Sequence, residues 1–280
     1  MEKHVKAVEV IAPTLFIICA AWLAWHAPAF ILDWSAGESS ASDNLRGLHL
    51  RNDVTPNMSG PFGGVADWID YFALIGLPVF LLLGIRTVRH APMEYESWRA
   101  ADRAAVFIGR VTMVLIVILT SVMLYEVLLR YVFEAPTLWA NELSLWLAGF
   151  VFLCAGLYAM QQRSHIRIYL IYDMFPRWLQ RICDVISTLL IVAFAFFLIY
   201  GGYGEAFAKF GRWETFGTAF DPPIPATLKP MVLLIVALVA IQSVINLISD
   251  WNNEPVIHTA ADDIDEDEIQ RLKKAVGADD

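Results

Sequence analysis

Six stretches without Asp, Glu, Lys or Arg constrain this chain more than any other feature. They are Val10–Leu32, Tyr71–Ile85, Val111–Tyr125, Leu143–Gln162, Val185–Gly204 and Pro230–Ser249. Four of them reach 20 residues or more, about the length at which one helix crosses a hydrocarbon core of about 30 Å. The two shorter runs lengthen when Arg86 and Arg110 at their edges extend toward the membrane interface. The pattern predicts an all-α integral membrane protein with six transmembrane helices.

Composition agrees with this fold class. The 280 residues are 58% hydrophobic and 18% charged, whereas soluble domains are nearer about 45–50% apolar and about 25% charged. Acidic side chains are concentrated in the tail 261–280, and the membrane part is close to neutral. No basic stripe with interleaved aromatic residues indicates a nucleic-acid partner. We divide the chain into an N-terminal extension with two helices (1–92), a four-helix membrane domain (93–253) and an acidic cytoplasmic tail (254–280).

Arginine is concentrated in alternate loops of the predicted topology. The loop between the second and third helices carries Arg86 to Arg110, and the loop between the fourth and fifth carries Arg163 to Arg181. By the positive-inside rule, both chain termini are then cytoplasmic. The segment Arg163–Arg181 is also amphipathic, which favours a short helix lying in the membrane interface.

Titratable side chains near the apolar runs are few. Glu126 and Arg130 are four residues apart and face the same side of a helix, where they suit a structural ion pair or a proton relay. Glu142 lies in the first turn of its helix, where an acid is favourable. No acid falls at the middle of a run, and no nucleophile, metal or cofactor motif is present. We therefore predict no catalytic residue, no metal site and no cofactor.

Small and aromatic residues mark the fourth predicted helix. Gly149 and Gly156 are seven residues apart and share a face, which allows close helix approach in lipid, either within the chain or with a partner. Trp139, in the preceding loop, suits an anchor at the membrane interface.

The order of these motifs resembles the small membrane subunit of TRAP transporters, the DctQ-like family. The motifs are Arg130-Tyr-x-Phe, Pro136-x-x-Trp139-x-x-Glu142-Leu143, Phe152-x-x-x-Gly156 and His165-Ile-Arg167-Ile. Lys229-Pro230 before an apolar helix with Gln242 is similar to the longer members, grouped with mannitol/chloroaromatic-type systems. The resemblance covers about residues 103–251, so the first two helices lie outside it. It departs from the family pattern at Ser164 and Tyr169, where the family has Gly and Asp.

The resemblance implies a partner set and a location. The expected partners are a large permease subunit, a periplasmic substrate-binding protein and membrane lipids. The expected role is to scaffold the large subunit during cation-coupled uptake of an organic acid across the bacterial inner membrane. The residues that we assign to structure or partner contact are Glu126, Arg130, Trp139, Glu142, Gly149, Gly156, His165 and Arg167.

Two other function classes stay open at the level of sequence. One is a membrane-anchor or quinone-site subunit of a redox complex, which would need haem ligands or a polar quinone pocket. The other is a small transporter that works alone.

Overall fold

The computed structural model describes residues 7–25, 68–91, 94, 99–100, 102–163, 172, 174–211 and 213–252. These residues form helices and no strands, so the prediction of an all-α protein is confirmed for this part of the chain. The helices are α1 (Ala7–Trp25), α4 (Trp68–Thr87), α5 (Asp102–Tyr131), α6 (Trp139–Gln161), α8 (Arg177–Gly211) and α9 (Ile224–Asp250).

Five helices are long and apolar enough to cross a membrane, namely α4, α5, α6, α8 and α9. The run Tyr71–Ile85, one of the two short ones, lies inside α4, which is 20 residues long. Helix α1 has 19 residues, and its apolar part is shorter than in the other five. The chain is therefore a membrane protein with at least five apolar helices of membrane length, while the sixth crossing stays a prediction.

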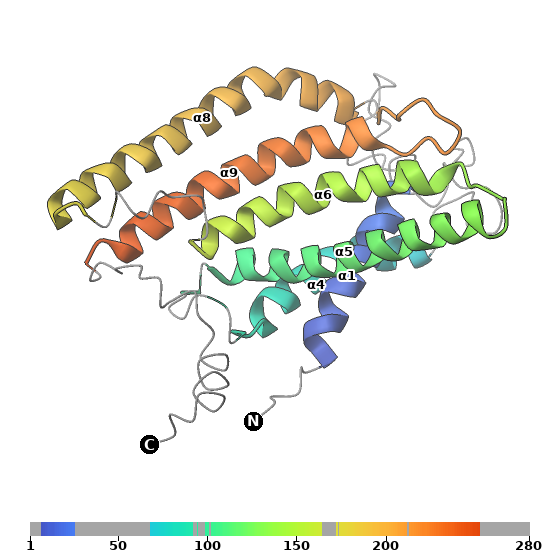
Figure 1. Cartoon of the computed structure of the whole chain (residues 1–280), viewed down its shortest axis with the longest axis horizontal. Helices are drawn as coiled ribbons and strands as arrows, with labels where there is room; N and C mark the ends of the chain where they lie inside the picture. Colours follow the sequence, from blue (N-terminus) through green and yellow to red (C-terminus); the bar gives the residue numbers. More distant parts are fainter. Residues whose placement is uncertain are drawn as a thin grey trace, which may run out of the picture.

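Four of the helices lie side by side in a row. Figure 1 shows α8, α9, α6 and α5 in this order, with α1 and α4 against α5. Each helix of the row packs on its neighbours, so α8 stands at one edge and contacts mainly α9. Side chains of α8 such as Leu189, Phe197 and Tyr200 are consequently 66%, 69% and 80% exposed. An apolar surface of this kind suits lipid tails or the helices of another membrane protein.

One cluster of the apolar core lies where α1 and α4 meet α5, and a second joins Ala105 of α5 to Leu157 of α6 and Ile235 of α9. Phe107, Val111 and Leu115 of α5 are buried in the first cluster with Ala12 of α1. Gly84 of α4 makes this approach possible, since a Cβ atom at Gly84 would lie 2.0 Å from the Phe107 ring. The absence of a side chain at this position thus fixes how closely α4 approaches α5.

Two helices extend well beyond the charge-free runs that predicted them. Helix α5 has 30 residues and α8 has 35, whereas the corresponding runs cover Val111–Tyr125 and Val185–Gly204. Charged residues continue each helix beyond its run in ion pairs. In α5, Arg110 binds Glu94 and Arg130 binds Glu126. In α8, Glu205 binds Lys229 and Lys209 binds Glu214.

The predicted interfacial segment Arg163–Arg181 is described only in part. Its last residues, from Arg177 on, form the first turn of α8, which begins directly after Pro176. Residues 164–171 and 173, residues 26–67 with the predicted outer loop, and the acidic tail from residue 253 lie outside the described residues.

Candidate functional site

One buried carboxylate organises the loop between α5 and α6. Glu126 is 4% exposed. It accepts hydrogen bonds from Nε and Nη2 of Arg130 at 3.1 and 2.5 Å. Its second oxygen accepts from the backbone N–H and the hydroxyl of Thr137, at 3.1 and 2.5 Å. Glu126 thus binds residues on both sides of the loop, which is a structural arrangement, since each carboxylate oxygen already has its donors.

A second group of contacts joins this loop to the one between α8 and α9. The Thr218 hydroxyl donates to Oε2 of Glu142 at 2.5 Å. The Trp139 ring lies 6.0 Å from Tyr125 and 6.5 Å from Phe220, measured between ring centroids. We call this end of the molecule, with residues 131–138 and 213–223, the loop end. Its aromatic rings and the Glu142–Thr218 bond hold the two loops together.

The two glycines of α6 have different surroundings. A Cβ atom at Gly149 would lie 2.5 Å from Cδ1 of Leu228, so α9 approaches α6 closely at this point. A Cβ atom at Gly156 would have no neighbour within 4 Å. Next to it along the helix, Phe152 is 79% exposed. Gly149 therefore serves packing within the chain, whereas Gly156 and Phe152 face outward.

The opposite end of the helices holds a buried hydrogen-bond network of Asp102, Gln242, Asn246 and the Met160 carbonyl. We call this end of the molecule the amide end, after the side-chain amides of Gln242 and Asn246. Nε2 of Gln242 donates to Oδ1 of Asp102 at 2.6 Å and to Oδ1 of Asn246 at 2.9 Å. Nδ2 of Asn246 donates to the carbonyl of Met160 at 2.7 Å. Asp102, Gln242 and Asn246 are 1%, 4% and 8% exposed. The network joins α5, α9 and α6 where water cannot replace the lost bonds.

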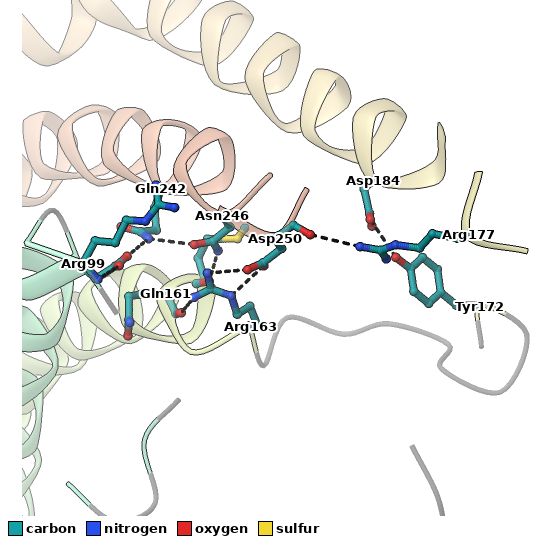
Figure 2. Close-up of polar contacts among 11 residues, drawn as sticks. Arg99, Gln161, Arg163, Tyr172, Arg177, Asp184, Gln242, Asn246 and Asp250 are labelled. Carbon is teal, nitrogen blue, oxygen red and sulfur yellow. Dashed lines mark hydrogen bonds and ion pairs between the residues drawn. The ribbon is translucent and has the colours of Figure 1, made fainter. Parts of the chain in front are cut away.

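An ion pair continues this end toward α8. Both oxygens of Asp250 accept from Arg163, at 2.9 and 3.1 Å, and the Asp250 carbonyl accepts from Arg177 at 3.1 Å. Figure 2 shows Gln242, Asn246 and Asp250 along α9, opposite Gln161 and Arg163 at the end of α6. The three α9 residues are four apart and therefore share one helix face. This face binds the ends of α6 and α8 together.

The sequence pointed to some of these residues and missed others. Glu126, Arg130, Trp139, Glu142 and Gly149 lie in the contacts described above. His165 and Arg167 lie outside the described residues. Asp102, Asn246 and Asp250 were not predicted, and the spacing of Gln242, Asn246 and Asp250 is the signal that could have found them. Within the described parts of the chain, no three His, Cys, Asp or Glu side chains are close enough to hold a metal ion.

Residues 119–252 match the family model of the DctQ component of tripartite ATP-independent periplasmic transporters. The chain contains a DctQ domain. The predicted resemblance to this family is confirmed, and the DctQ family is a transporter component rather than an enzyme. No curated protein and no solved structure matches the chain.

The DctQ match begins inside α5 and runs through α6, α8 and α9. It therefore includes the loop end and the α6–α9 part of the amide end. Asp102, at the start of α5, lies outside the matched residues, as do α1 and α4. Hydrogen bonds thus join the helices of the DctQ domain to one another at both ends. At the amide end, Gln242 of the domain also binds Asp102, which precedes the match.

Proposed function

We propose that this chain is the small permease subunit of a TRAP transporter, which holds a large permease subunit in place during cation-coupled uptake of an organic acid. A periplasmic binding protein would deliver the substrate. The observation that carries this proposal is the DctQ match in a chain whose polar side chains bind one another at the two ends of the helices. A scaffold needs such internal bonds, whereas a transport pathway needs polar groups left for the substrate.

The exposed apolar surface supports a membrane partner. Helix α8 contacts mainly α9, and Phe152 with Gly156 leaves part of α6 open. Trp139 and Glu142 at the loop end are proposed contacts for a partner or supports for the loop. A Glu142→Gln variant that leaves both complex assembly and transport unchanged would reject this role.

The proposed location is the bacterial inner membrane with both termini in the cytoplasm. Arg86, Arg103, Arg110, Arg163 and Arg177 all belong to the helix ends on the side of the amide end. The positive-inside rule assigns this side to the cytoplasm and the loop end to the periplasm. A cysteine at Leu138, which is 75% exposed, should react with a membrane-impermeant maleimide added to cells with a permeabilised outer membrane. Labelling only after the inner membrane is broken would show that the loop end faces the cytoplasm and that the proposed orientation is wrong.

Purification from the native membrane tests whether the proposed partner binds this chain. The tagged chain is solubilised in mild detergent, and the accompanying proteins are identified. We expect a larger protein with many membrane crossings to co-purify in constant ratio. A chain that never accompanies such a protein is not the scaffold of a large permease.

A further inference from the structure

A buried carboxylate outside the DctQ match joins three parts of the chain. Glu94 lies in the connection between α4 and α5, and its side chain is 4% exposed. Oε1 of Glu94 accepts from Nη2 of Arg110 on α5 at 2.8 Å and from the Tyr158 hydroxyl of α6 at 2.9 Å. Oε2 accepts from the backbone N–H of Ala91 at 2.8 Å.

The contact with Ala91 alone would be an ordinary turn. The other two contacts reach much further along the chain, since Tyr158 is 64 residues from Glu94. Arg110 also donates to the carbonyl of Arg89 at 3.2 Å. The connection that leaves α4 is therefore bound to two helices of the row, α5 and α6.

A glycine admits Tyr158 to this position. A Cβ atom at Gly109 of α5 would lie 2.4 Å from Cδ2 of Tyr158. The Tyr158 ring thus packs directly against the α5 backbone at Gly109, where any side chain would block it, and its hydroxyl reaches Glu94. The same device recurs where Gly84 of α4 admits the Phe107 ring.

One further polar contact joins α4 to the row, since Nη1 of Arg103 on α5 donates to the carbonyl of Arg86 at 3.1 Å, but that contact is exposed. The contacts of α1 with α5 are apolar. Ala12 and Phe16 of α1 pack on Phe107 and Val111 of α5. In lipid, apolar packing of this kind holds helices by van der Waals contact alone, because lipid tails are equally apolar. A buried ion pair with full hydrogen bonding restrains orientation more strongly, because breaking it leaves an unpaired buried charge.

We propose that Glu94 fixes the orientation of the α1–α4 pair relative to the DctQ domain, through its bonds to Arg110 on α5 and Tyr158 on α6. The two N-terminal helices then move with the DctQ domain as one body. They also permanently cover the face of α5 that carries Phe107, Val111 and Leu115. A partner of the DctQ domain has to bind on another side.

Distance measurements by pulsed electron paramagnetic resonance test whether Glu94 fixes the helix pair, and they need no partner protein. Spin labels at Ile75 of α4 and Leu234 of α9, which are 63% and 54% exposed, report how the pair sits relative to the DctQ domain. Cys183 is replaced by Ser, and the native Cys19 and Cys154 are buried. Full-length protein in lipid nanodiscs should give one narrow distance distribution. A broad distribution would overturn the proposal, because the helix pair would not be fixed.

Glu94→Gln is the decisive variant. We expect the Ile75–Leu234 distribution to broaden and to gain a population at a different distance. Glu205→Gln is the matched control, because Glu205 forms a more exposed ion pair with Lys229 elsewhere, and its distribution should stay narrow. An unchanged narrow distribution in Glu94→Gln would show that Glu94 does not fix the orientation of the α1–α4 pair.

Tyr158→Phe covers the case in which Glu94→Gln does not fold. Phenylalanine keeps the ring over Gly109 and removes only the hydroxyl that binds Glu94. We expect a smaller broadening of the same distribution than in Glu94→Gln. A Tyr158→Phe protein with the narrow distribution of the parent would leave the α6 contact without a role and contradict the proposal.

Discussion

Asp250, at the end of α9, binds Arg163, just beyond the end of α6, through both carboxylate oxygens at 2.9 and 3.1 Å. The two residues are 87 positions apart in the sequence. Arg177 at the start of α8 donates to the Asp250 carbonyl as well. A single residue therefore holds three helix ends, which makes Asp250 the natural place to test whether the amide end stabilises the row.

Asp250→Asn should lower the stability of the isolated chain in detergent. The side chains of Arg163 and Asp250 are 15% and 37% exposed, so solvent screens part of the attraction and the expected loss is about 1 kcal/mol. Thermal unfolding of the purified protein measures the loss. Glu205→Gln, which removes a more exposed pair, is the control with the smaller effect, and an equal effect in both variants would contradict a special role for Asp250.

Gln242→Leu should be more damaging than Asp250→Asn, because it leaves the buried Oδ1 atoms of Asp102 and Asn246 without the Gln242 donor. The expected cost is about 1–3 kcal/mol, typical for a buried group left unsatisfied. A double-mutant cycle with Asp102→Ala isolates the contact between the two side chains. Strictly additive effects in that cycle would show that Asp102 and Gln242 are not coupled.

Glu126→Ala should destabilise the α5–α6 loop more than Arg130→Ala. Glu126 binds both Arg130 and Thr137, whereas loss of Arg130 still leaves the two Thr137 donors. The Arg130 side chain is also 48% exposed, so its removal alone should cost at most about 1 kcal/mol. Limited proteolysis of the loop and thermal unfolding report the difference. Equal effects of the two variants would contradict a central place for Glu126.

Gly149→Leu and Gly156→Leu form a matched pair on α6. Leucine at Gly149 would overlap Leu228, and overpacking of this kind costs about 1–3 kcal/mol, so the isolated chain should lose stability. Leucine at Gly156 meets open space and adds helix propensity, so the isolated chain should keep its stability. Thermal unfolding of both variants tests this contrast. A destabilised Gly156→Leu protein would show that α6 is not open there.

The charge-free runs predicted where apolar helices lie, because the membrane demands apolar length and little else. They did not predict how far α5 and α8 continue. Arg110 lies inside α5 in an ion pair with Glu94, and Glu94 lies outside every run. A charged residue at the edge of a run is therefore a helix residue or a loop residue according to a partner that spacing does not reveal.

The local pairs of the site were within reach of the sequence, and the distant ones were not. Glu126 and Arg130 are one helical turn apart, so their spacing brings them together. Gln242, Asn246 and Asp250 also share a face by spacing, but nothing local indicates that this face meets Asp102 and Arg163. Those contacts depend on the order of the helices in the row, which periodicity does not determine.

Reconstituted uptake tests the scaffold role most directly. Proteoliposomes carry the large subunit with this chain, the large subunit alone, or this chain alone, each with the binding protein and its substrate outside. We predict substrate uptake only when both membrane subunits are present, and none with this chain alone. Uptake by this chain alone, or undiminished uptake by the large subunit without it, would contradict the account.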